Sequence, residues 1–242
     1  MNTLIKIIVT NILALTLFSC NFSMKIGPGV DGNGNVVTTE RSISSDFDQI
    51  KVSEGLDVYI TQANEVSVNV EADENLQDII LTEVENGILR IHTAENIRSA
   101  SSRRINLSIA NVSSIKATSG SDVYSTNTIV AENLELNTTS GADMKIEVKT
   151  KNLTCDATSG SDLIVSGTTD ILKAEATSGS DIRATDLIAN TSNVKATSGA
   201  DISVNTKKEL TAKATSGGDI KYSGNPEKVN ASDSSSGSVK QQ

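Results

Sequence analysis

Six aspartates recur along the chain in one sequence context, and they are the residues best placed to do chemistry. Each ends a pentapeptide Thr-Ser-Gly-X-Asp, in which X is Ser, Ala or Gly. Carboxylates at a constant interval could bind Ca²⁺, which takes oxygen ligands. Each could instead accept backbone N–H groups within its own turn, as Asp side chains often do. We predict the turn role, with a calcium-binding column as the alternative. The six aspartates are Asp122, Asp143, Asp162, Asp181, Asp201 and Asp219.

Few other residues could support catalysis. His92 is the only histidine, which argues against a His-dependent nucleophilic triad and excludes a metal site with several histidines. We predict that Cys155 is a small buried side chain rather than a reactive thiol. Pairs of carboxylates could hydrolyse glycosidic bonds, but three Tyr, three Phe and no Trp offer no aromatic cluster for stacking sugars. We therefore predict no catalytic residues and no enzyme, and a carbohydrate-active enzyme is a third alternative.

Short extended segments must position the aspartates. Apolar or small residues alternate before each pentapeptide, as at Leu153, Cys155 and Ala157, and an apolar residue directly follows each aspartate. Period-two alternation on both sides of a Gly-containing corner indicates strand, turn, strand. One repeat cannot bury its own apolar face, so the copies must stack about 4.8 Å apart and share a core. We predict an all-β fold, a right-handed parallel β-solenoid (β-helix) with coils of about 20 residues.

Glycines mark the predicted corners, because glycine adopts backbone geometries that other residues reach only with strain. Gly55-Leu56-Asp57 is an earlier, isolated copy of the Gly-X-Asp pattern, and residues 235–238 are a late copy without the aspartate. In a regular stack the aspartates would lie about 5 Å apart and repel one another. Solvent or cations such as Arg183 would have to reduce that repulsion. The predicted turn glycines are Gly55, Gly120, Gly141, Gly160, Gly179, Gly199 and Gly217.

The repeats divide the chain into parts. Residues 116–239 are the predicted regular solenoid, and residues 240–242 are a tail. Residues 41–115 alternate without the repeat, and the 65 residues from Gly55 to Gly120 equal about three coils. This part is therefore either degenerate coils or a β-rich cap over the first edge of the solenoid. Residues 20–40 are rich in Gly and Asn, so we predict a lipid anchor followed by a flexible tether.

The N-terminus predicts export. Lys6 precedes an apolar stretch, Ile7 to Phe18, which has the length of a signal-peptide core and is too short for a comfortable membrane span. It ends in Leu17-Phe18-Ser19-Cys20, which resembles the lipobox of bacterial lipoproteins, with Phe18 bulkier than the usual occupant. The resemblance implies cleavage of residues 1–19 and lipidation of Cys20. The lipid on Cys20 would then be the sole membrane attachment.

The composition of the chain limits the classes of partner that it can bind. The formal net charge is -9 and the isoelectric point is about 4.7, which argues against nucleic acid, because nucleic acids select basic surfaces. Aromatic residues make up 2% of the chain, so Val, Ile, Leu and Ala must supply the buried surface. That composition suits a thin repetitive core better than one large central core.

Two segments of residues 41–115 resemble a known family. Phe47-Asp48-Gln49-Ile50-Lys51-Val52 leads to Gly55-Leu56-Asp57-Val58-Tyr59-Ile60-Thr61-Gln62, and Asn86-Gly87-Ile88-Leu89-Arg90-Ile91 follows. Together with the repeats they resemble the auto-transporter adhesin head GIN domain family, which is common in envelope lipoproteins of Bacteroidetes-type bacteria. Leu56-Asp57 stands where the family's nickname has Ile-Asn. The match covers residues 41–239 and implies a β-helix-like fold in an exported protein, without a known activity or functional residues.

These observations predict a non-catalytic cell-envelope lipoprotein that acts as a structural or interaction module, adhesin-like in character. The alternative is a calcium- or glycan-binding solenoid that uses the aspartate column. No cofactor is predicted apart from that calcium alternative. The partner is an unidentified protein or glycan, and the lipid on Cys20 favours the outer membrane, on either its periplasmic or its outer face.

Overall fold

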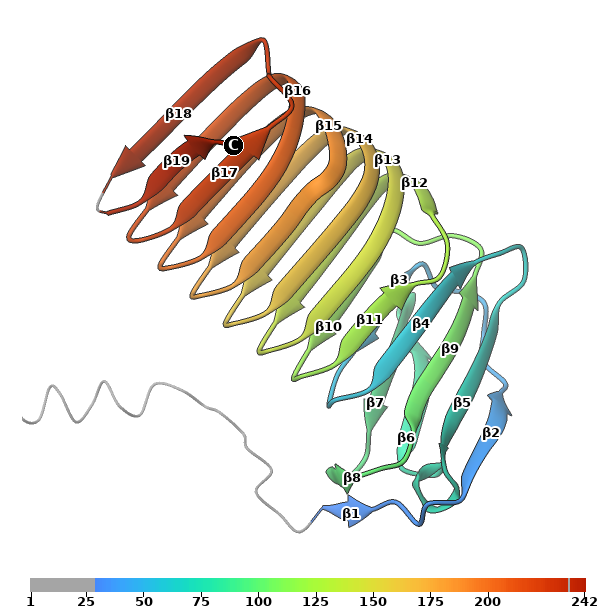
Figure 1. Ribbon diagram of the computed structural model, residues 1–242. Helices are drawn as coiled ribbons and strands as arrows, with labels where there is room; N and C mark the ends of the chain where they lie inside the picture. Colours follow the sequence, from blue (N-terminus) through green and yellow to red (C-terminus); the bar gives the residue numbers. More distant parts are fainter. Residues whose placement is uncertain (1–28, 235) are drawn as a thin grey trace, which may run out of the picture.

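The computed structural model describes residues 29–234 and 236–242. Within them the chain forms nineteen β-strands and one short 3-10 helix, η1 (Glu74–Leu76). The strands build one elongated body, in which a stack of coils follows a differently built N-terminal part (Figure 1). Among the described residues, no helix is long and apolar enough to cross a bilayer.

The repeats form the predicted stack, which confirms the parallel β-solenoid. Four of the five longest strands run from one corner to the next, the first covers only the later part of its coil, and successive strands pair in parallel. About seven turns follow one another at intervals of about 19 residues. The five strands are β12 (Ile129–Thr139), β13 (Asp143–Thr158), β14 (Asp162–Thr177), β15 (Asp181–Thr197) and β16 (Asp201–Thr215).

Shorter strands begin and end the repeats. The first coil holds β10 (Ser114–Thr118) and β11 (Asp122–Ser125), and the last coils hold β17 (Asp219–Ser223), β18 (Lys228–Ser234) and β19 (Ser238–Gln241). β19 pairs in parallel with β17. The tail predicted at residues 240–242 is therefore wrong for its first two residues, since backbone pairing continues the stack even where the aspartate of the repeat is missing.

Each coil supplies one segment before its corner and one after it, so the stack consists of two sheets. We call them the pre-corner sheet and the post-corner sheet. Between them lie buried apolar rows, one of which consists of the small and medium-sized side chains Leu136, Cys155, Ala174, Val194 and Ala212. Burial raises the pKa of the Cys155 thiol, which leaves it a packing residue without thiolate reactivity, as predicted.

The corners need two residues in the left-handed region rather than one. Ser119 has φ +58° and Gly120 has φ +68°, and the N–H of Ser121 bonds to the carbonyl oxygen of Thr118 at 3.3 Å. Positive φ at both central residues defines a type I′ turn. The remaining predicted glycines also have positive φ, but the strained residue before each glycine, which is Glu54 at Gly55 and a serine at the others, was not predicted.

Gly55 belongs to a coil that lies directly against the first repeat. β3 (Gln49–Val52) pairs with β10, and β4 (Asp57–Gln62) pairs with β11, both in parallel. The 65 residues from Gly55 to Gly120 therefore do not form three coils in sequence order. Instead, the chain leaves the stack after β4 and returns to the next rung at β10.

The departing segment builds the cap. It contains β5 (Ser67–Asp73), β6 (Ile80–Glu85), β7 (Ile88–Thr93), β8 (Ile97–Ser99) and β9 (Arg103–Ile109). β7 and β9 pair in parallel with β3 and β4 on the side away from the repeats. β6 then pairs antiparallel with β7, and β5 pairs antiparallel with β9. Residues 41–115 thus combine both predicted arrangements, one coil and a cap.

The flexible tether predicted over residues 20–40 is wrong from residue 30 onward. β1 (Val30–Asp31) pairs with β8, and β2 (Val36–Arg41) pairs antiparallel with β5 at the outer edge of the cap. The buried carboxylate of Asp73 accepts hydrogen bonds from the backbone N–H groups of Gly34, at 2.5 Å, and Ser101, at 2.7 Å. Specific bonds, which composition does not reveal, hold this glycine-rich segment.

The predicted signal peptide, residues 1–19, and the predicted lipidation site, Cys20, lie outside the described residues.

Candidate functional site

The aspartates form one column along the post-corner sheet. Parallel pairing places each one beside the next in register, and Asp57 of the β3–β4 coil joins the N-terminal end beside Asp122. Burial, followed by the charges of Asp57 and Asp143, raises the pKa of Asp122. Burial and two column neighbours likewise raise the pKa of Asp201. The predicted like-charge column is therefore real and electrostatically unfavourable.

Arg183 reduces the repulsion where predicted. Its Nη2 donates to the Oδ2 of Asp162 at 3.3 Å and to the Oδ2 of Asp181 at 2.8 Å. The turn role predicted for the aspartates is wrong, however. Among the described residues, no carboxylate of the six repeats accepts a backbone hydrogen bond at its corner, because these side chains begin the next strand and point outward.

Buried serines at the X position hold the corners instead. The Oγ of Ser180 accepts a hydrogen bond from the N–H of Thr177 at 3.1 Å and donates to the carbonyl oxygen of Thr177 at 2.8 Å. Ser121 and Ser161 repeat both contacts. This role was missed because Ala and Gly occupy the same position in other copies. The sequence did contain a signal for this role, because the residue before each aspartate lies on the opposite face of the chain and so points inward.

The calcium alternative gains no geometric support. Across the described residues, no three His, Cys, Asp or Glu side chains come together as a set that could hold a metal ion. Column carboxylates meet their neighbours only along one line, one rung apart, whereas Ca²⁺ takes six to eight oxygens around it.

Two tyrosines stack where the sequence showed no aromatic cluster. Tyr59 and Tyr124 occupy the same position in adjacent coils, with ring centroids 5.2 Å apart and planes 25° apart. The guanidinium of Arg104 lies 4.2 Å from the centroid of the Tyr59 ring. Both occur two residues after a Gly-X-Asp, so the repeat register could have predicted the pair. Because the rings face each other along the stack, they strengthen the junction between the cap and the repeats.

The outer surface of the pre-corner sheet, which we call the polar face, carries aligned rows of polar side chains. One row consists of the threonines that open the corners, and a second row carries charges. From the cap toward the C-terminus the charged row is Arg90, Lys51, Lys116, Asn137, Asp156, Glu175, Lys195 and Lys213. The threonine row is Thr118, Thr139, Thr158, Thr177, Thr197 and Thr215.

Surface hollows follow these rows. The central hollow, about 410 Å³, runs from Lys116 to Lys195 between the threonine and charged rows. A smaller hollow of about 250 Å³ lies at the cap end, beside Lys51 and Arg90. The polar face is therefore furrowed along the axis of the stack rather than flat.

Charges change sign along the polar face. In its middle, burial raises the pKa of Asp156, and the charges of Glu175 and Glu135 add to that rise while Lys173 opposes it. Glu175 pairs with Lys173 at 3.4 Å and with Lys195 at 3.8 Å. An acidic centre thus lies between a cationic segment at the cap and lysines toward the C-terminus.

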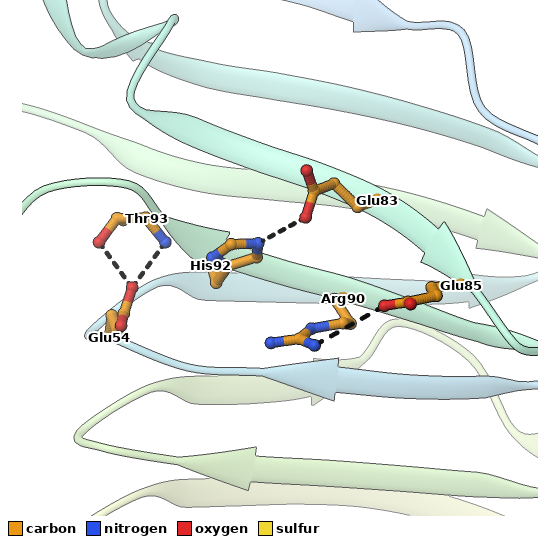
Figure 2. A network of polar contacts seen from close by, with 6 residues as sticks. All are labelled: Glu54, Glu83, Glu85, Arg90, His92 and Thr93. Carbon is orange, nitrogen blue, oxygen red and sulfur yellow. Dashed lines mark hydrogen bonds and ion pairs between the residues drawn. The ribbon is translucent and has the colours of Figure 1, made fainter.

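The cap end of the polar face contains a small polar network, shown in Figure 2. His92 Nε2 lies 3.0 Å from Glu83 Oε2, and one oxygen of Glu54 accepts from both the N–H of Thr93 at 2.7 Å and its hydroxyl at 2.8 Å. Arg90 reaches Glu85 at 4.0 Å. His92 lies partly exposed on its strand, and its contact with Glu83 was not predicted, because the antiparallel β6–β7 hairpin that joins them was not.

The sequence profile of one protein family matches residues 46–226, more than half of the chain. Its description reads "Putative auto-transporter adhesin, head GIN domain". The chain belongs to this family, which confirms the resemblance seen in the sequence. No curated protein matches the chain.

Solved structures share the fold. A putative adhesin from Bacteroides fragilis NCTC 9343 has 20% identity and a TM-score of 0.82, over 88% of this chain and 100% of the other. A putative lipid binding protein from Parabacteroides distasonis ATCC 8503 has 24% identity and a TM-score of 0.73, over 88% and 99%. A putative adhesin from Parabacteroides merdae ATCC 43184 has 18% identity and a TM-score of 0.71, over 88% and 99%. At these identities the likeness shows the fold alone.

Proposed function

We propose that this member of the head GIN domain family is a non-catalytic protein of the cell envelope that binds its partner through the polar face. The observation that carries the proposal is the alignment of hydroxyl and charged rows across successive rungs of one rigid stack. A repeated surface of this kind offers many equivalent contacts, so weak individual contacts add up to avid binding. The family is described as a putative adhesin, and the solved structures reported above are named putative adhesins or, in one case, a putative lipid binding protein, which supports this reading.

The proposal includes a lipid anchor at Cys20 in the outer membrane. The lipobox-like segment that ends at Cys20 supports it, and so does the adhesin-type family, which indicates an envelope or extracellular location. A lipid at this position would join the β1 strand through a short segment. The cap would then lie nearest the membrane, and the coils would project away from it.

Protease shaving of intact cells tests the proposal. We expect digestion of the protein on whole cells, and weaker attachment of a deletion strain to its surface, restored by the wild-type gene. Lysed cells provide the control for susceptibility to the protease. Protection on intact cells together with digestion after lysis would contradict the contact role at the cell surface.

Calcium provides a separate test of the aspartate column. Because its carboxylates meet only along a line, we expect millimolar Ca²⁺ to leave the thermal unfolding midpoint unchanged apart from ionic strength, for which Mg²⁺ is the control. A rise with Ca²⁺ alone that is lost in Asp162→Asn would restore the calcium-binding alternative.

A further inference from the structure

Three cations lie side by side at the cap end of the polar face. Arg90 of β7 pairs in register with Lys51 of β3, which pairs in register with Lys116 of β10. All three side chains point outward, since their strand neighbours Leu89, Ile50 and Ile115 are buried. Like charges on adjacent strands are destabilising. The chain has 21 basic and 30 acidic residues, so this cationic segment runs against its overall charge.

The protein itself neutralises this segment poorly. The ion pair of Arg90 with Glu85 is 4.0 Å long, and both side chains are about half exposed or more, so solvent weakens it. Within residues 29–234 and 236–242, neither Lys51 nor Lys116 forms an ion pair. Some cations elsewhere on the stack find partners on the next coil, as Lys151 does with Glu132 at 2.8 Å and Lys228 with Glu209 at 2.6 Å. Other lysines of the stack, such as Lys149, also lack an ion pair among the described residues, so the segment is distinguished by its three cations on adjacent strands.

A hollow of about 250 Å³ opens at two of these cations, Lys51 and Arg90, while Lys116 lines the adjoining central hollow. Ligand pockets for drug-sized molecules begin at about 300 Å³, so this one suits a single small ring or group. Its wall mixes cations with hydroxyls and one carboxylate. The lining residues are Lys51, Ser53, Glu54, Arg90, His92, Thr118 and Ser119.

Glu54 distinguishes between kinds of anion. Thr93 holds one of its carboxylate oxygens through two hydrogen bonds, which fixes the carboxylate at the wall beside the cations (Figure 2). A carboxylate there repels a bare anion but accepts hydrogen bonds from hydroxyl groups. The wall therefore favours a ligand that carries both a negative group and hydroxyls.

We propose that this hollow binds an acidic sugar unit, with its sulfate, phosphate or carboxylate on Arg90 and Lys51 and its ring hydroxyls on Glu54 and the corner hydroxyls, while Lys116, the register neighbour of Lys51, holds the next acidic unit. The inference rests on the proposed contact function and names its partner as an anionic glycan. The threonine row leads from this hollow to the end of the central one at Lys116, so a second acidic unit can follow the axis there, before the acidic centre at Asp156 and Glu175 is reached. A pyranose unit is about as long as the 4.8 Å step between rungs.

Titration calorimetry on the detergent-purified full chain tests the proposal. The probes are a sulfated heparin hexasaccharide, a galacturonate hexamer, neutral maltohexaose, inorganic phosphate and phosphatidylglycerol vesicles. We expect an anionic hexasaccharide to bind and maltohexaose not to bind. Lys51→Gln and Lys116→Gln should each weaken binding about tenfold, the loss of one charge-assisted contact. Lys149→Gln is the matched control, an exposed lysine without an ion pair among the described residues, and should leave binding unchanged.

Other results would overturn the inference. Equal weakening by Lys149→Gln would indicate general charge attraction, and phosphate as tight as the hexasaccharides would indicate a bare anion site. Vesicle binding with the same lysine dependence would indicate a membrane headgroup instead. Thermal unfolding midpoints that are unchanged or higher in Lys51→Gln and Lys116→Gln would show that these variants are folded, so that their weaker binding is due to the lost charge. If no sugar binds but protease still digests the protein on intact cells, the acidic-glycan site alone is contradicted. If the protein is protected from protease on intact cells, the surface role itself is contradicted.

Discussion

The cap and the repeat coils share two sheets and one buried core, yet their interiors differ in size. A single inward row runs from Leu89 through Ile50 and Ile115 into the repeats, where it becomes Cys155 and Ala174. The neighbouring row changes in the same direction, from Ile91 and Val52 at the cap to alanines in the coils. In these two rows, large aliphatic side chains fill the cap and mostly small side chains fill the coils, whereas the row after each aspartate stays large in the coils, as at Leu163 and Ile182.

This difference indicates how a stack of coils that are unstable on their own can begin. Each coil gains stability from its neighbours and little from its own thin core. The first coil lacks a preceding neighbour, so β7 and β9 supply the missing rung and β5 and β6 end the parallel pairing with antiparallel strands. Because β3 and β4 lie between the cap and the repeats, and the chain returns from the cap to the next rung at β10, the cap is bonded to the stack on both sheets.

The largest effect should come from cutting the cap's core. Ile105 of β9 is fully buried and pairs with Val58 on one side and Val70 on the other. Ile105→Ala should lower the free energy of unfolding by about 2–5 kcal/mol, because it leaves a cavity between three strands. Cys155→Ala in the coils, equally buried, should cost only about 1 kcal/mol. Equal losses of unfolding free energy in the two variants, measured by urea denaturation, would contradict the difference in side-chain size between the cap and the coils.

The second-largest effect on stability should come from substitutions at the corners. Gly179 has φ +67° with open space where a Cβ would stand, so Gly179→Ala should cost about 1 kcal/mol from backbone strain alone. Ser178 has φ +59°, and Asn tolerates that region better than Ser, so Ser178→Asn should be neutral or stabilising. Destabilisation by Ser178→Asn in the same assay would count against the type I′ corner.

The coils could be predicted from sequence much more fully than the cap. Repetition shows the period, and identical neighbours in register follow from it, so Asp122 beside Asp143 needed no tertiary information. The cap has no period, and its order in space departs from its order in the chain. That is why Gly34 was expected in a tether, although it bonds to Asp73, and why Arg90 was not expected beside Lys51. The Tyr59–Tyr124 pair lay within reach, since both follow a Gly-X-Asp.

The smallest effect concerns the aspartate column. The pKa values of Asp57, Asp122 and Asp201 are raised in the fold, with burial as the leading cause. The folded protein therefore binds these protons more tightly than the unfolded chain, so their contribution to stability improves as the pH falls through the raised folded pKa values toward the ordinary value. Above that window Asp122→Asn should stabilise by about 0.2–1 kcal/mol. That gain should shrink on acidification, and a gain independent of pH would contradict the column.

One cross-linking measurement tests the central claim. The claim is that the chain, on its return from the cap, places β10 beside β3 and so brings Lys116 beside Lys51. Positions 51 and 116 are register partners 65 residues apart in sequence, within the Cα separation that a disulfide spans. Lys51→Cys with Lys116→Cys should form a disulfide readily under mild oxidation. Lys51→Cys with Asn137→Cys, two rungs apart, should not. Equal cross-linking of both pairs, or none at 51 and 116, would contradict this arrangement.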